Sequence, residues 1–570
     1  MNERIGVYIC YCGGNISDYV DVEKVREVVE KEHGVVVAKT VMFACSDAAQ
    51  QMMIEDIKNE NLDAMVVASC SPRLHLYTFR NVARRAGLNP YKYVQVNLRE
   101  QDSWAHTDDP AGATEKAIRL VRAGIARARH AEALEPLRIE TEPAVLVVGA
   151  GISGLRAAIG LADLGISVYV VEKSDAPGGW VKDFDRIYQT GKSGKKIIEK
   201  LIEEVKRRGN IVLYTSAEVI ERKGCVGDFN IKIRLKTGEI VEIRAGAVII
   251  ATGFDVYQPQ RGEYGFGSPD VITLPEFKRL VESSNGKLTH NGKEIRSIAY
   301  IYCVGSRQSD GNQYCSRFCC NAAIHTSCMV SEKYPEVYQY HLYRDIRTYG
   351  KYELMYEEAR NRGAIFIRFS EDSPPQVETS DKGVKIKVRD TLSDGEELHI
   401  EPDLVVLVTG MVPRSNDKLV EIFKLPVGRD GFFNEIHPKL RPVETVMDGI
   451  YICGACQGPK NIPESVASAL LAVTKAGGLL KKGYVELEPT VARIDAEKCE
   501  WCGDCAEACP FDAIEKVSID GREVARIKEA LCKGCGACVP VCTKDAIDVQ
   551  GYTDMQIKSM IEALAQEVQV

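Results

Sequence analysis

The stretch Ala144-Val-Leu-Val-Val-Gly-Ala-Gly-Ile-Ser-Gly154 decides how the centre of this chain folds. Its apolar run predicts a buried β-strand, which passes through a glycine-rich turn into a helix. In such a turn Gly149 permits the tight bend, Gly151 permits close approach of a pyrophosphate, and Gly154 lets the helix pack closely on the strand. The positive end of the helix then faces the phosphates. The stretch therefore predicts a dinucleotide-binding fold of the Rossmann type.

The sequence that follows supports this prediction. The strand Ser167–Val171 ends at Glu172, whose carboxylate can bind a pair of ribose hydroxyls. The strand Ala247–Ala251 runs into Thr252-Gly253, an ending typical of flavoproteins with two dinucleotide-binding domains. The alternative is a Rossmann unit that binds no cofactor.

The segment Asp448–Gly454 resembles the strand that closes the flavin site in relatives of thioredoxin reductase. Those proteins usually carry Asp after the last glycine, where this chain has Ala455. The resemblance favours FAD over NAD at the first site. The expected cofactor-binding residues are Gly149, Gly151, Ser153, Gly154, Glu172, Lys173, Gly178, Gly179, Trp180, Ala251, Thr252, Gly253, Gly454, Ala455 and Ile462.

Two cysteine quartets near the C-terminus give the strongest signal in the sequence. They are Cys499-x2-Cys502-x2-Cys505-x3-Cys509 and Cys532-x2-Cys535-x2-Cys538-x3-Cys542. Bacterial ferredoxins have this spacing, and in them three cysteines bind one [4Fe–4S] cluster while the fourth binds the other. The first cluster is therefore expected on Cys499, Cys502, Cys505 and Cys542, and the second on Cys532, Cys535, Cys538 and Cys509. Zinc ribbons, the alternative, favour paired Cys-x2-Cys motifs with long gaps.

The region near residue 300 departs from a thioredoxin-reductase-like pattern. A second glycine-rich motif for NAD(P)H is expected there, but the strand Ile298–Cys303 is followed by further cysteines. Direct use of NAD(P)H by this chain is therefore not expected. The candidate ligands of one [4Fe–4S] cluster in this region are Cys303, Cys315, Cys319 and Cys320. The alternative is a redox-active dithiol beside the flavin.

The composition is that of an ordinary globular protein, since 45% of the 570 residues are hydrophobic and 27% are charged. With 73 Lys and Arg against 81 Asp and Glu, the formal net charge is −8, which argues against a general nucleic-acid-binding protein. A chain of this length does not need disulfides in place of a core, so its 20 cysteines indicate metal or redox ligands in a reducing, cytoplasmic compartment. No apolar run predicts a membrane span, and Met1–Asn15 lacks the pattern of a signal peptide.

The apolar periodicity divides the chain into several α/β domains. The strands expected in the first domain are Ile5–Cys10, Val35–Phe43 and Ala64–Ser69, and its expected helices include Asp21–His33 and Gly112–Ala131. The expected domains are a small N-terminal α/β domain at 1–135, a thioredoxin-reductase-like FAD domain at 144–490, a 2[4Fe–4S] ferredoxin domain at 491–552 and a C-terminal helix at 553–570.

Together these features resemble the A-type iron–sulfur flavoprotein subunits of the CoB–CoM heterodisulfide reductase family over nearly the whole chain. The motifs that carry the resemblance are Cys10–Ile16, Cys45–Asp47, Cys70–His75, Asn97–Glu100, Trp104–His106, Cys303–Arg307, Tyr314–Cys320, Tyr343–Gly350 and Cys456–Glu464. The resemblance implies an N-terminal cluster, and thus four [4Fe–4S] clusters in all. Its ligands would be Cys10, Cys12, Cys45 and Cys70. Three of these end or follow expected strands and can meet at one edge of a parallel sheet; ordinary buried cysteines are the alternative.

Two departures from the family pattern stand out. Many methanogen homologues carry an inserted ferredoxin-like segment after the double glycine, where this chain has only a short polar stretch and the charged helix Lys195–Arg208. The family also commonly shows a lysine near the flavin at the position of His325. An unperturbed histidine titrates near pH 6.5, so we expect flavin potentials that depend on pH between about 6 and 7. The alternative is a histidine that only fills space. No role is assigned to Cys225, Cys328, Cys453 and Cys456.

The resemblance implies a flavin-dependent iron–sulfur oxidoreductase. Such a protein splits or merges electron pairs at FAD, which is flavin-based electron bifurcation or confurcation, and passes single electrons through its clusters. The implied partners are other heterodisulfide reductase-like subunits, ferredoxin and a hydrogenase or dehydrogenase module that donates electrons, with a homodimer inside the larger complex. A non-bifurcating electron conduit in a quinone-linked or aromatic-ring-reducing complex is one alternative, and a non-redox scaffold is another.

Overall fold

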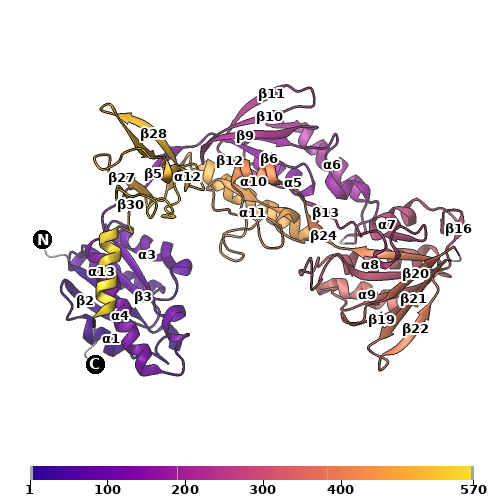
Figure 1. Ribbon diagram of the computed structural model, residues 1–570, viewed down its shortest axis with the longest axis horizontal. Coiled ribbons are helices and arrows are strands. Elements are labelled where there is room, and N and C mark those ends of the chain that lie inside the picture. Colours follow the sequence, from indigo (N-terminus) through magenta and orange to yellow (C-terminus); the bar gives the residue numbers. More distant parts are fainter. Residues whose placement is uncertain (1–3, 189, 382, 567–570) are drawn as a thin grey trace. The chain divides into compact units, whose positions relative to one another are not determined.

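The computed structural model describes residues 4–188, 190–381 and 383–566 (Figure 1). The chain forms two compact units, which we call unit 1 and unit 2. Unit 1 comprises Met1–Arg138 together with Glu486–Val570, and unit 2 comprises Ile139–Val485. Unit 1 therefore contains both ends of the sequence, and unit 2 is built from one continuous segment.

The N-terminal part of unit 1 is a parallel sheet with the strand order β2-β1-β3-β4. The strands are β1 (Ile5–Cys10), β2 (Val35–Val41), β3 (Ala64–Ser69) and β4 (Tyr93–Asn97). The helices are α1 (Val22–Val29), α2 (Asp47–Asn59), α3 (Pro72–Ala86) and α4 (Pro110–Arg129). Every residue of β1 and β3 is buried, as expected for the centre of a parallel sheet covered by helices. Helix α4 can lie close to this sheet because Gly124 has no side chain: a Cβ there would lie 2.4 Å from a methyl group of Val96.

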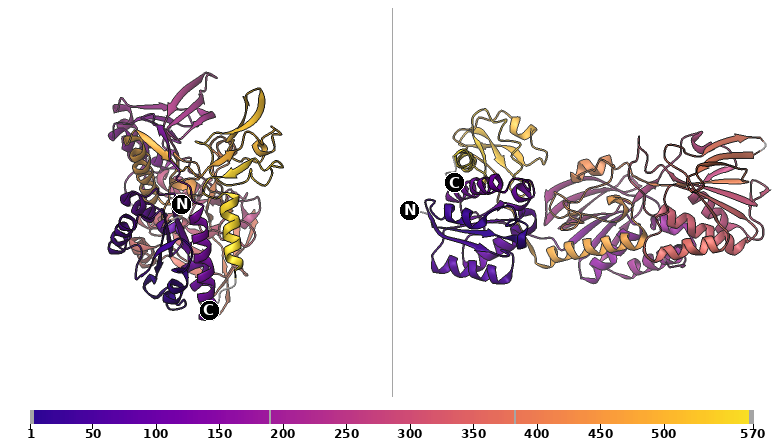
Figure 2. Two further views of the ribbon diagram at one scale, coloured as in Figure 1. Left: turned by 90° about the vertical axis from the view of Figure 1, so that its left-hand side faces the viewer. Right: turned by 90° about the horizontal axis from the view of Figure 1, so that it is seen from below.

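The C-terminal part of unit 1 holds two short antiparallel pairs and a final helix. Its elements are β27 (Ala492–Ile494), α12 (Asp504–Glu507), β28 (Ile514–Ile519), β29 (Arg522–Ile527), β30 (Ile547–Val549) and α13 (Asp554–Ala565). Helix α13 lies beside α4, with Met560 and Ala563 packed against Ala126 (Figure 2). Gln556 also donates a hydrogen bond to the carbonyl of His130 at 2.9 Å. The helix expected at 553–570 thus packs on the N-terminal domain, and the part of that range from 567 to 570 lies outside the described residues.

Unit 2 begins with the Rossmann-type sheet that the glycine-rich stretch predicts. Its strand order is β25-β12-β6-β7-β8, and all of its pairs are parallel. The strands are β6 (Ala144–Val148), β7 (Ser167–Val171), β8 (Ile211–Tyr214), β12 (Ala247–Ile250) and β25 (Ile450–Ile452). The accompanying helices are α5 (Ile152–Asp163), α6 (Gly194–Arg207) and α11 (Ile462–Lys481). A three-stranded antiparallel sheet of β9 (Glu218–Cys225), β10 (Asp228–Arg234) and β11 (Ile240–Ala245) follows β8.

The second half of unit 2 repeats the parallel arrangement with the order β14-β23-β17-β18-β19. The strands are β14 (Val271–Thr273), β17 (Ser297–Val304), β18 (Tyr338–Tyr343), β19 (Ile365–Arg368) and β23 (Leu404–Thr409). The helices are α7 (Leu274–Ser283), α8 (Cys319–Lys333) and α9 (Glu353–Asn361). A three-stranded antiparallel sheet follows, made of β20 (Gln376–Ser380), β21 (Gly383–Asp390) and β22 (Glu396–Ile400). The multidomain α/β fold class expected from the sequence is confirmed.

Candidate functional site: a dinucleotide cavity and four cysteine groups

Unit 2 contains a cavity of about 820 Å³ at the carboxyl ends of β6 and β7. A cavity of this size at the end of a Rossmann-type sheet matches the usual place of a dinucleotide. The expected binding residues that line it are Gly149, Gly151, Ser153, Glu172, Lys173, Gly178, Gly179, Trp180, Ala251, Thr252, Gly253, Ala455 and Ile462. The two others, Gly154 and Gly454, are not among the lining residues. The residues present therefore fit FAD.

The glycines of the fingerprint differ in what surrounds them. Gly149 has a φ of +104°, and a Cβ there would lie 2.5 Å from the carbonyl oxygen of Ala251. A Cβ on Gly154 would lie 1.8 Å from the carbonyl oxygen of Gly149, so helix and turn touch at this point. Gly151, in contrast, has a φ of −71° and no atom within 4 Å of the position of a Cβ. Its missing side chain leaves the cavity open where a pyrophosphate would bind.

The carboxylate of Glu172 is held in place by hydrogen bonds from two backbone N–H groups. One oxygen accepts a hydrogen bond from the backbone N–H of Ala150 at 2.7 Å, and the other accepts one from the N–H of Ser174 at 2.9 Å. Trp180 donates its indole N–H to the carbonyl of Phe254 at 3.1 Å. These contacts fix the cavity wall before any ligand binds.

Another part of the cavity wall contains His325 from α8 and Lys278 from α7. The ammonium of Lys278 pairs with Glu282 at 3.1 Å and donates to the carbonyl of Arg186 at 2.7 Å. Neither Lys278 nor Arg186 can be recognised as a cavity residue from the sequence, because a lysine on an amphipathic helix ordinarily faces solvent. In the structure only 8% of Lys278 is exposed.

The environment of His325 differs from the sequence expectation. Burial, together with the charges of Lys278 and Arg186, lowers the pKa of His325 to about 3. The imidazole is therefore neutral throughout pH 6–7, and the expected titration in that range is wrong for this site. The cationic groups at this end of the cavity are Lys278 and Arg186, which pair with Glu282 and Glu332. A catalytic role for His325 remains a prediction.

The four cysteines expected to bind the central cluster come together at the start of α8. Cys303 lies near the end of β17 with a φ of +63°, Cys315 lies in the loop, and Cys319 and Cys320 begin the helix. A hydrogen bond with Cys320, burial, and the charges of Cys303 and Cys315 raise the pKa of Cys319. One thiol thus interacts with the other three. In addition, the backbone N–H of Arg317 donates to the sulfur of Cys315 at 3.3 Å.

The ferredoxin region brings its eight cysteines together in two groups. One small cavity is lined by Cys499, Cys502, Cys505 and Cys542, and a second by Cys509, Cys532, Cys535 and Cys538. These are the crossed sets expected from the spacing. In each set two sulfurs accept a backbone N–H of an alanine: Ala525 donates to Cys499, Ala546 to Cys542, Ala492 to Cys532 and Ala513 to Cys509, at 3.3–3.4 Å. Hydrogen bonds to the sulfurs are among the factors that set the potential of an iron–sulfur cluster.

The N-terminal cysteines lie at the carboxyl edge of the unit 1 sheet. Cys10 ends β1, Cys12 begins the short helical turn η1 (Cys12–Gly14), Cys45 precedes α2, and Cys70 follows β3. The sulfur of Cys10 accepts backbone N–H bonds from Cys12 at 3.2 Å and Ala44 at 3.3 Å. Burial raises the pKa of Cys10, and the charges of Cys12 and Cys45 contribute to that rise. Burial likewise raises the pKa of Cys70 to about 11, with smaller contributions from Cys12 and Cys10.

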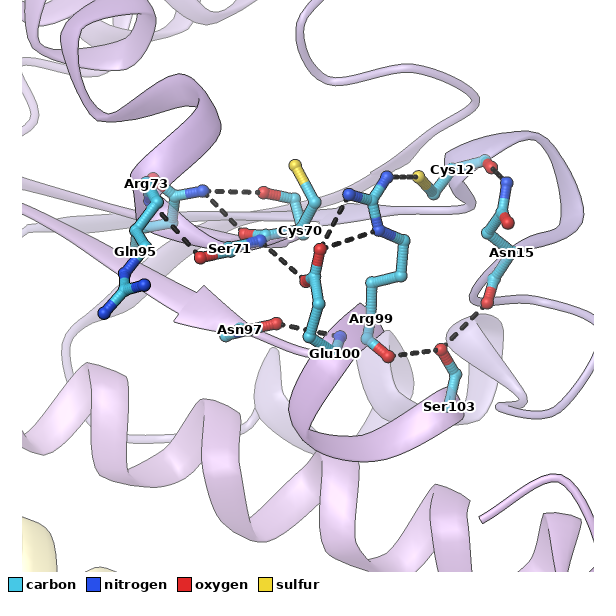
Figure 3. A network of polar contacts seen from close by, with 11 residues as sticks. Cys12, Asn15, Cys70, Ser71, Arg73, Gln95, Asn97, Arg99, Glu100 and Ser103 are labelled. Carbon is cyan, nitrogen blue, oxygen red and sulfur yellow. Dashed lines mark hydrogen bonds and ion pairs between the residues drawn. The ribbon is translucent and has the colours of Figure 1, made fainter. Parts of the chain in front are cut away.

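Arg99 places a positive charge among these thiols (Figure 3). It donates to the sulfur of Cys12 at 3.4 Å and pairs with Glu100 at 2.7 Å. Glu100 in turn accepts the backbone N–H of Ser71, next to Cys70, at 2.8 Å. Both residues begin the single-turn π-helix η2 (Arg99–Ser103), a rare element that is frequent at functional sites. The motif Asn97–Glu100 carries the family resemblance in the sequence, but the contact of Arg99 with Cys12 is visible only in the structure.

Among the described residues, no group of three or more His, Cys, Asp or Glu side chains is arranged to hold a single metal ion.

No helix in the described part of the chain has the length and apolarity needed to span a bilayer.

Comparisons with known proteins agree with this geometry. A 4Fe-4S dicluster domain model matches residues 492–549, and an NAD(P)-binding Rossmann-like domain model matches residues 147–197. The second A-type iron-sulfur subunit of CoB–CoM heterodisulfide reductase from Methanopyrus kandleri is 40% identical over an alignment of 608 positions, gaps included, that covers 91% of this chain and 92% of that protein. The A-type subunit of the H2:CoB-CoM heterodisulfide,ferredoxin reductase from Methanothermobacter thermautotrophicus is 37% identical over 90% of both chains. This chain belongs to the family of A-type heterodisulfide reductase subunits.

The family also includes a protein of Archaeoglobus profundus that is named for its likeness to these A-type subunits and is 32% identical over 90% of this chain and 91% of its own. Among solved structures, the thioredoxin reductase of T. acidophilum matches 59% of this chain and 99% of its own, with 19% identity and a TM-score of 0.41. As a member of this family, the protein is a flavin-dependent iron–sulfur oxidoreductase that transfers electrons as part of a complex.

The contrast between Gly151 and Gly154 gives the first prediction. Gly151→Ala should leave the thermal unfolding temperature of the FAD-free protein unchanged, because its Cβ meets no protein atom. The same Cβ would occupy the space of the pyrophosphate, so FAD affinity measured by fluorescence titration should fall at least tenfold. Gly154→Ala is the matched control and should lower the unfolding temperature, because its Cβ overlaps the carbonyl of Gly149. Equal FAD affinity in Gly151→Ala and the wild type would contradict the assignment of the cavity.

Asp102 in η2 gives a second prediction. It is fully buried, neither carboxylate oxygen has a hydrogen-bond partner, and burial raises its pKa to about 6. A raised carboxyl pKa favours the protonated form in the folded state, so this contribution to stability is present below about pH 4 and is lost as the pH rises through 6. Asp102→Asn should therefore stabilise the protein at pH 8 by on the order of 2–3 kcal/mol, and at pH 4.5 by only about a third of that. Anaerobic thermal unfolding at both pH values tests this, and an equal difference at both would contradict it.

Proposed function

We propose that this protein binds one FAD and four [4Fe–4S] clusters and distributes electrons between carriers of different potential. For each electron pair taken from a mid-potential donor, one electron goes to a disulfide-type or other high-potential acceptor and one to a low-potential one-electron carrier. The reverse flow would merge two single electrons into a pair. FAD supplies the exchange between two-electron and one-electron chemistry, and clusters carry one electron each.

The observation that carries this proposal is the continuity of α8. The helix begins with Cys319 and Cys320, and His325 on the same helix lines the dinucleotide cavity. Five residues of helix span about 8 Å. Phe318, which directly precedes Cys319, also lines the cavity. A cofactor in the cavity and a cluster on the four cysteines would therefore be close neighbours, which is the arrangement that a flavin coupled to single-electron carriers needs.

The residues around the cavity would hold the cofactor and exclude water. The open position at Gly151 would face the pyrophosphate, and Glu172 would take the ribose. Lys278 and Arg186, each paired with a glutamate, would lie beside the cofactor together with the neutral His325. A nearby cation favours negative charge on a bound group, and its paired glutamate reduces that effect.

The same proposal assigns the other subunits of a heterodisulfide reductase-like complex as partners, with ferredoxin as the low-potential carrier and a hydrogenase or dehydrogenase module as the donor. The names of relatives from Methanopyrus and Methanothermobacter refer to such reductases. We also propose that the protein is cytoplasmic, because reduced thiols persist in the cytoplasm. A homodimer within that complex is what the family resemblance implies.

Metal and flavin analysis of the anaerobically purified protein tests the cofactor content. We expect about 16 iron atoms and one FAD per chain, since each [4Fe–4S] cluster contributes four irons. The double variant Cys319→Ser, Cys320→Ser should lose about 4 irons. The control Cys328→Ser lies on the same helix outside the four-cysteine group and should retain all of them. About 8 irons in the wild type would restrict the clusters to the ferredoxin region and contradict the proposal.

Potentiometric titration of the bound flavin separates electron splitting from simple conduction. Splitting requires that the flavin titrate as a two-electron couple, with a Nernst slope of about 30 mV per decade. Two resolved one-electron steps with slopes of about 59 mV would contradict splitting and assign the protein to a non-bifurcating conduit.

A further inference from the structure

Unit 1 exposes large apolar side chains around its cysteine edge. Met42 is 57% exposed, Phe43 48%, Leu74 42%, Tyr77 70% and Trp104 52%. Each lies in a segment that follows the carboxyl end of a strand: 42 and 43 follow β2, 74 and 77 follow β3, and 104 follows β4. Isolated exposed apolar residues are ordinary, but a concentration of them at one edge of a sheet indicates an interaction surface.

Two of these side chains contact the groups that surround Cys12. The ring of Phe43 packs on η1 so closely that a Cβ on Gly13 would lie 2.7 Å from it. The guanidinium of Arg99, which donates to the sulfur of Cys12, lies 4.8 Å from the ring centre of Trp104. Cys45, two residues after Phe43, is itself exposed. Phe43 and Trp104 thus lie beside groups that contact Cys12.

Helix α3 continues this surface and makes it positive. It contains four arginines and no carboxylate. Arg80 pairs with Glu488, whereas Arg73, Arg84 and Arg85 are exposed and form no ion pair with any described residue. Leu74, Tyr77, Arg84 and Arg85 follow one another at helical spacing and share the exposed face of the helix. Leu74 and Tyr77 lie towards the cysteine edge, whereas Arg84 and Arg85 lie in the last turn, about 18 Å along the helix from its first residue. On a chain with a net charge of −8, this helix is a local basic region.

We name Met42, Phe43, Leu74, Arg73, Tyr77, Arg84, Arg85 and Trp104 the cysteine-edge patch. We propose that this patch is the docking surface for an acidic one-electron carrier protein of the ferredoxin type, which exchanges electrons with the N-terminal cysteine group. The exchange moves one electron, oxidises one partner and reduces the other, and transfers no atoms. The assignment rests on the proposed function, because it requires a cluster on Cys10, Cys12, Cys45 and Cys70.

The chemistry of the patch favours this occupant. Aromatic side chains and arginines contribute most of the binding energy at protein interfaces. Unpaired arginines attract an acidic partner and steer its approach, an effect that weakens with ionic strength. A small surface of this kind suits a weak, short-lived encounter, as electron-transfer proteins form. The exposed Cys45 would be the ligand nearest to the partner.

The test measures binding of a recombinant acidic 2[4Fe–4S] ferredoxin to the complete holoprotein by calorimetry at low and high salt. The triple variant Arg73→Glu, Arg84→Glu, Arg85→Glu should weaken binding at least tenfold at low salt. The variant Leu74→Ser, Tyr77→Ser should weaken it at both salt concentrations, because its loss is apolar. The matched control Lys195→Glu, Lys196→Glu, Lys200→Glu reverses three exposed charges on α6 and should bind like the wild type.

Three results would overturn the docking proposal. These are an absence of binding to the wild type, equal binding by the arginine variant and the lysine control, and a shift from dimer to monomer in the patch variants by light scattering. The last result would assign the patch to a second copy of the chain. Iron analysis of the same samples keeps the two proposals separate. Loss of binding with normal iron supports docking. A wild type that binds ferredoxin but lacks iron at the N-terminal cysteines contradicts the proposed cluster and the electron exchange that depends on it, and supports the docking surface alone.

Discussion

The structure depends on one geometric constraint. Thiols from distant parts of the sequence have to converge while the backbone N–H and C=O groups around them keep their hydrogen bonds. The carboxyl edge of a parallel sheet meets this constraint, because neighbouring strands all end at the same side. In unit 1 the edge collects Cys10, Cys45 and Cys70 from three different strand ends. In unit 2 the same type of edge holds the dinucleotide cavity at β6 and β7, and Cys303 lies near the end of β17 in the second sheet. Rigid sheets therefore replace the local spacing motifs that a ferredoxin uses.

This difference explains what the sequence could predict. The Rossmann-type unit and the ferredoxin quartets follow from local patterns, namely glycines at fixed offsets and cysteines two or three residues apart. The crossed sets that include Cys509 and Cys542 could be inferred because the spacing itself encodes the crossing, and the structure lines one cavity with each set. The packing of α13 on α4 could not be inferred. It joins segments that lie far apart in the sequence, and neither segment has a motif that identifies the other as its partner.

The electrostatics of the cavity and of the cysteine edge were the least predictable part. A histidine at position 325 suggests a group that titrates near neutrality, but burial beside Lys278 and Arg186 lowers its pKa to about 3. In the sequence, Lys278 and Arg99 themselves resemble surface residues. Their role depends on what surrounds them in three dimensions: Lys278 is buried against the carbonyl of Arg186, and Arg99 is held between Glu100 and Cys12. Charges near redox centres can therefore be recognised only once the packing is known.

The division of unit 1 between both ends of the sequence has a consequence for the synthesis of the chain. The face of α4 that contains Ala126 is covered by α13, whose first residue follows the end of α4 by about 425 residues. At a translation rate of about 5–20 residues per second, that face stays uncovered for on the order of 20–90 s on each nascent chain. All of unit 2 leaves the ribosome during this interval. Until α13 has been made, this face of the N-terminal domain is therefore open to water or to whatever binds the nascent chain.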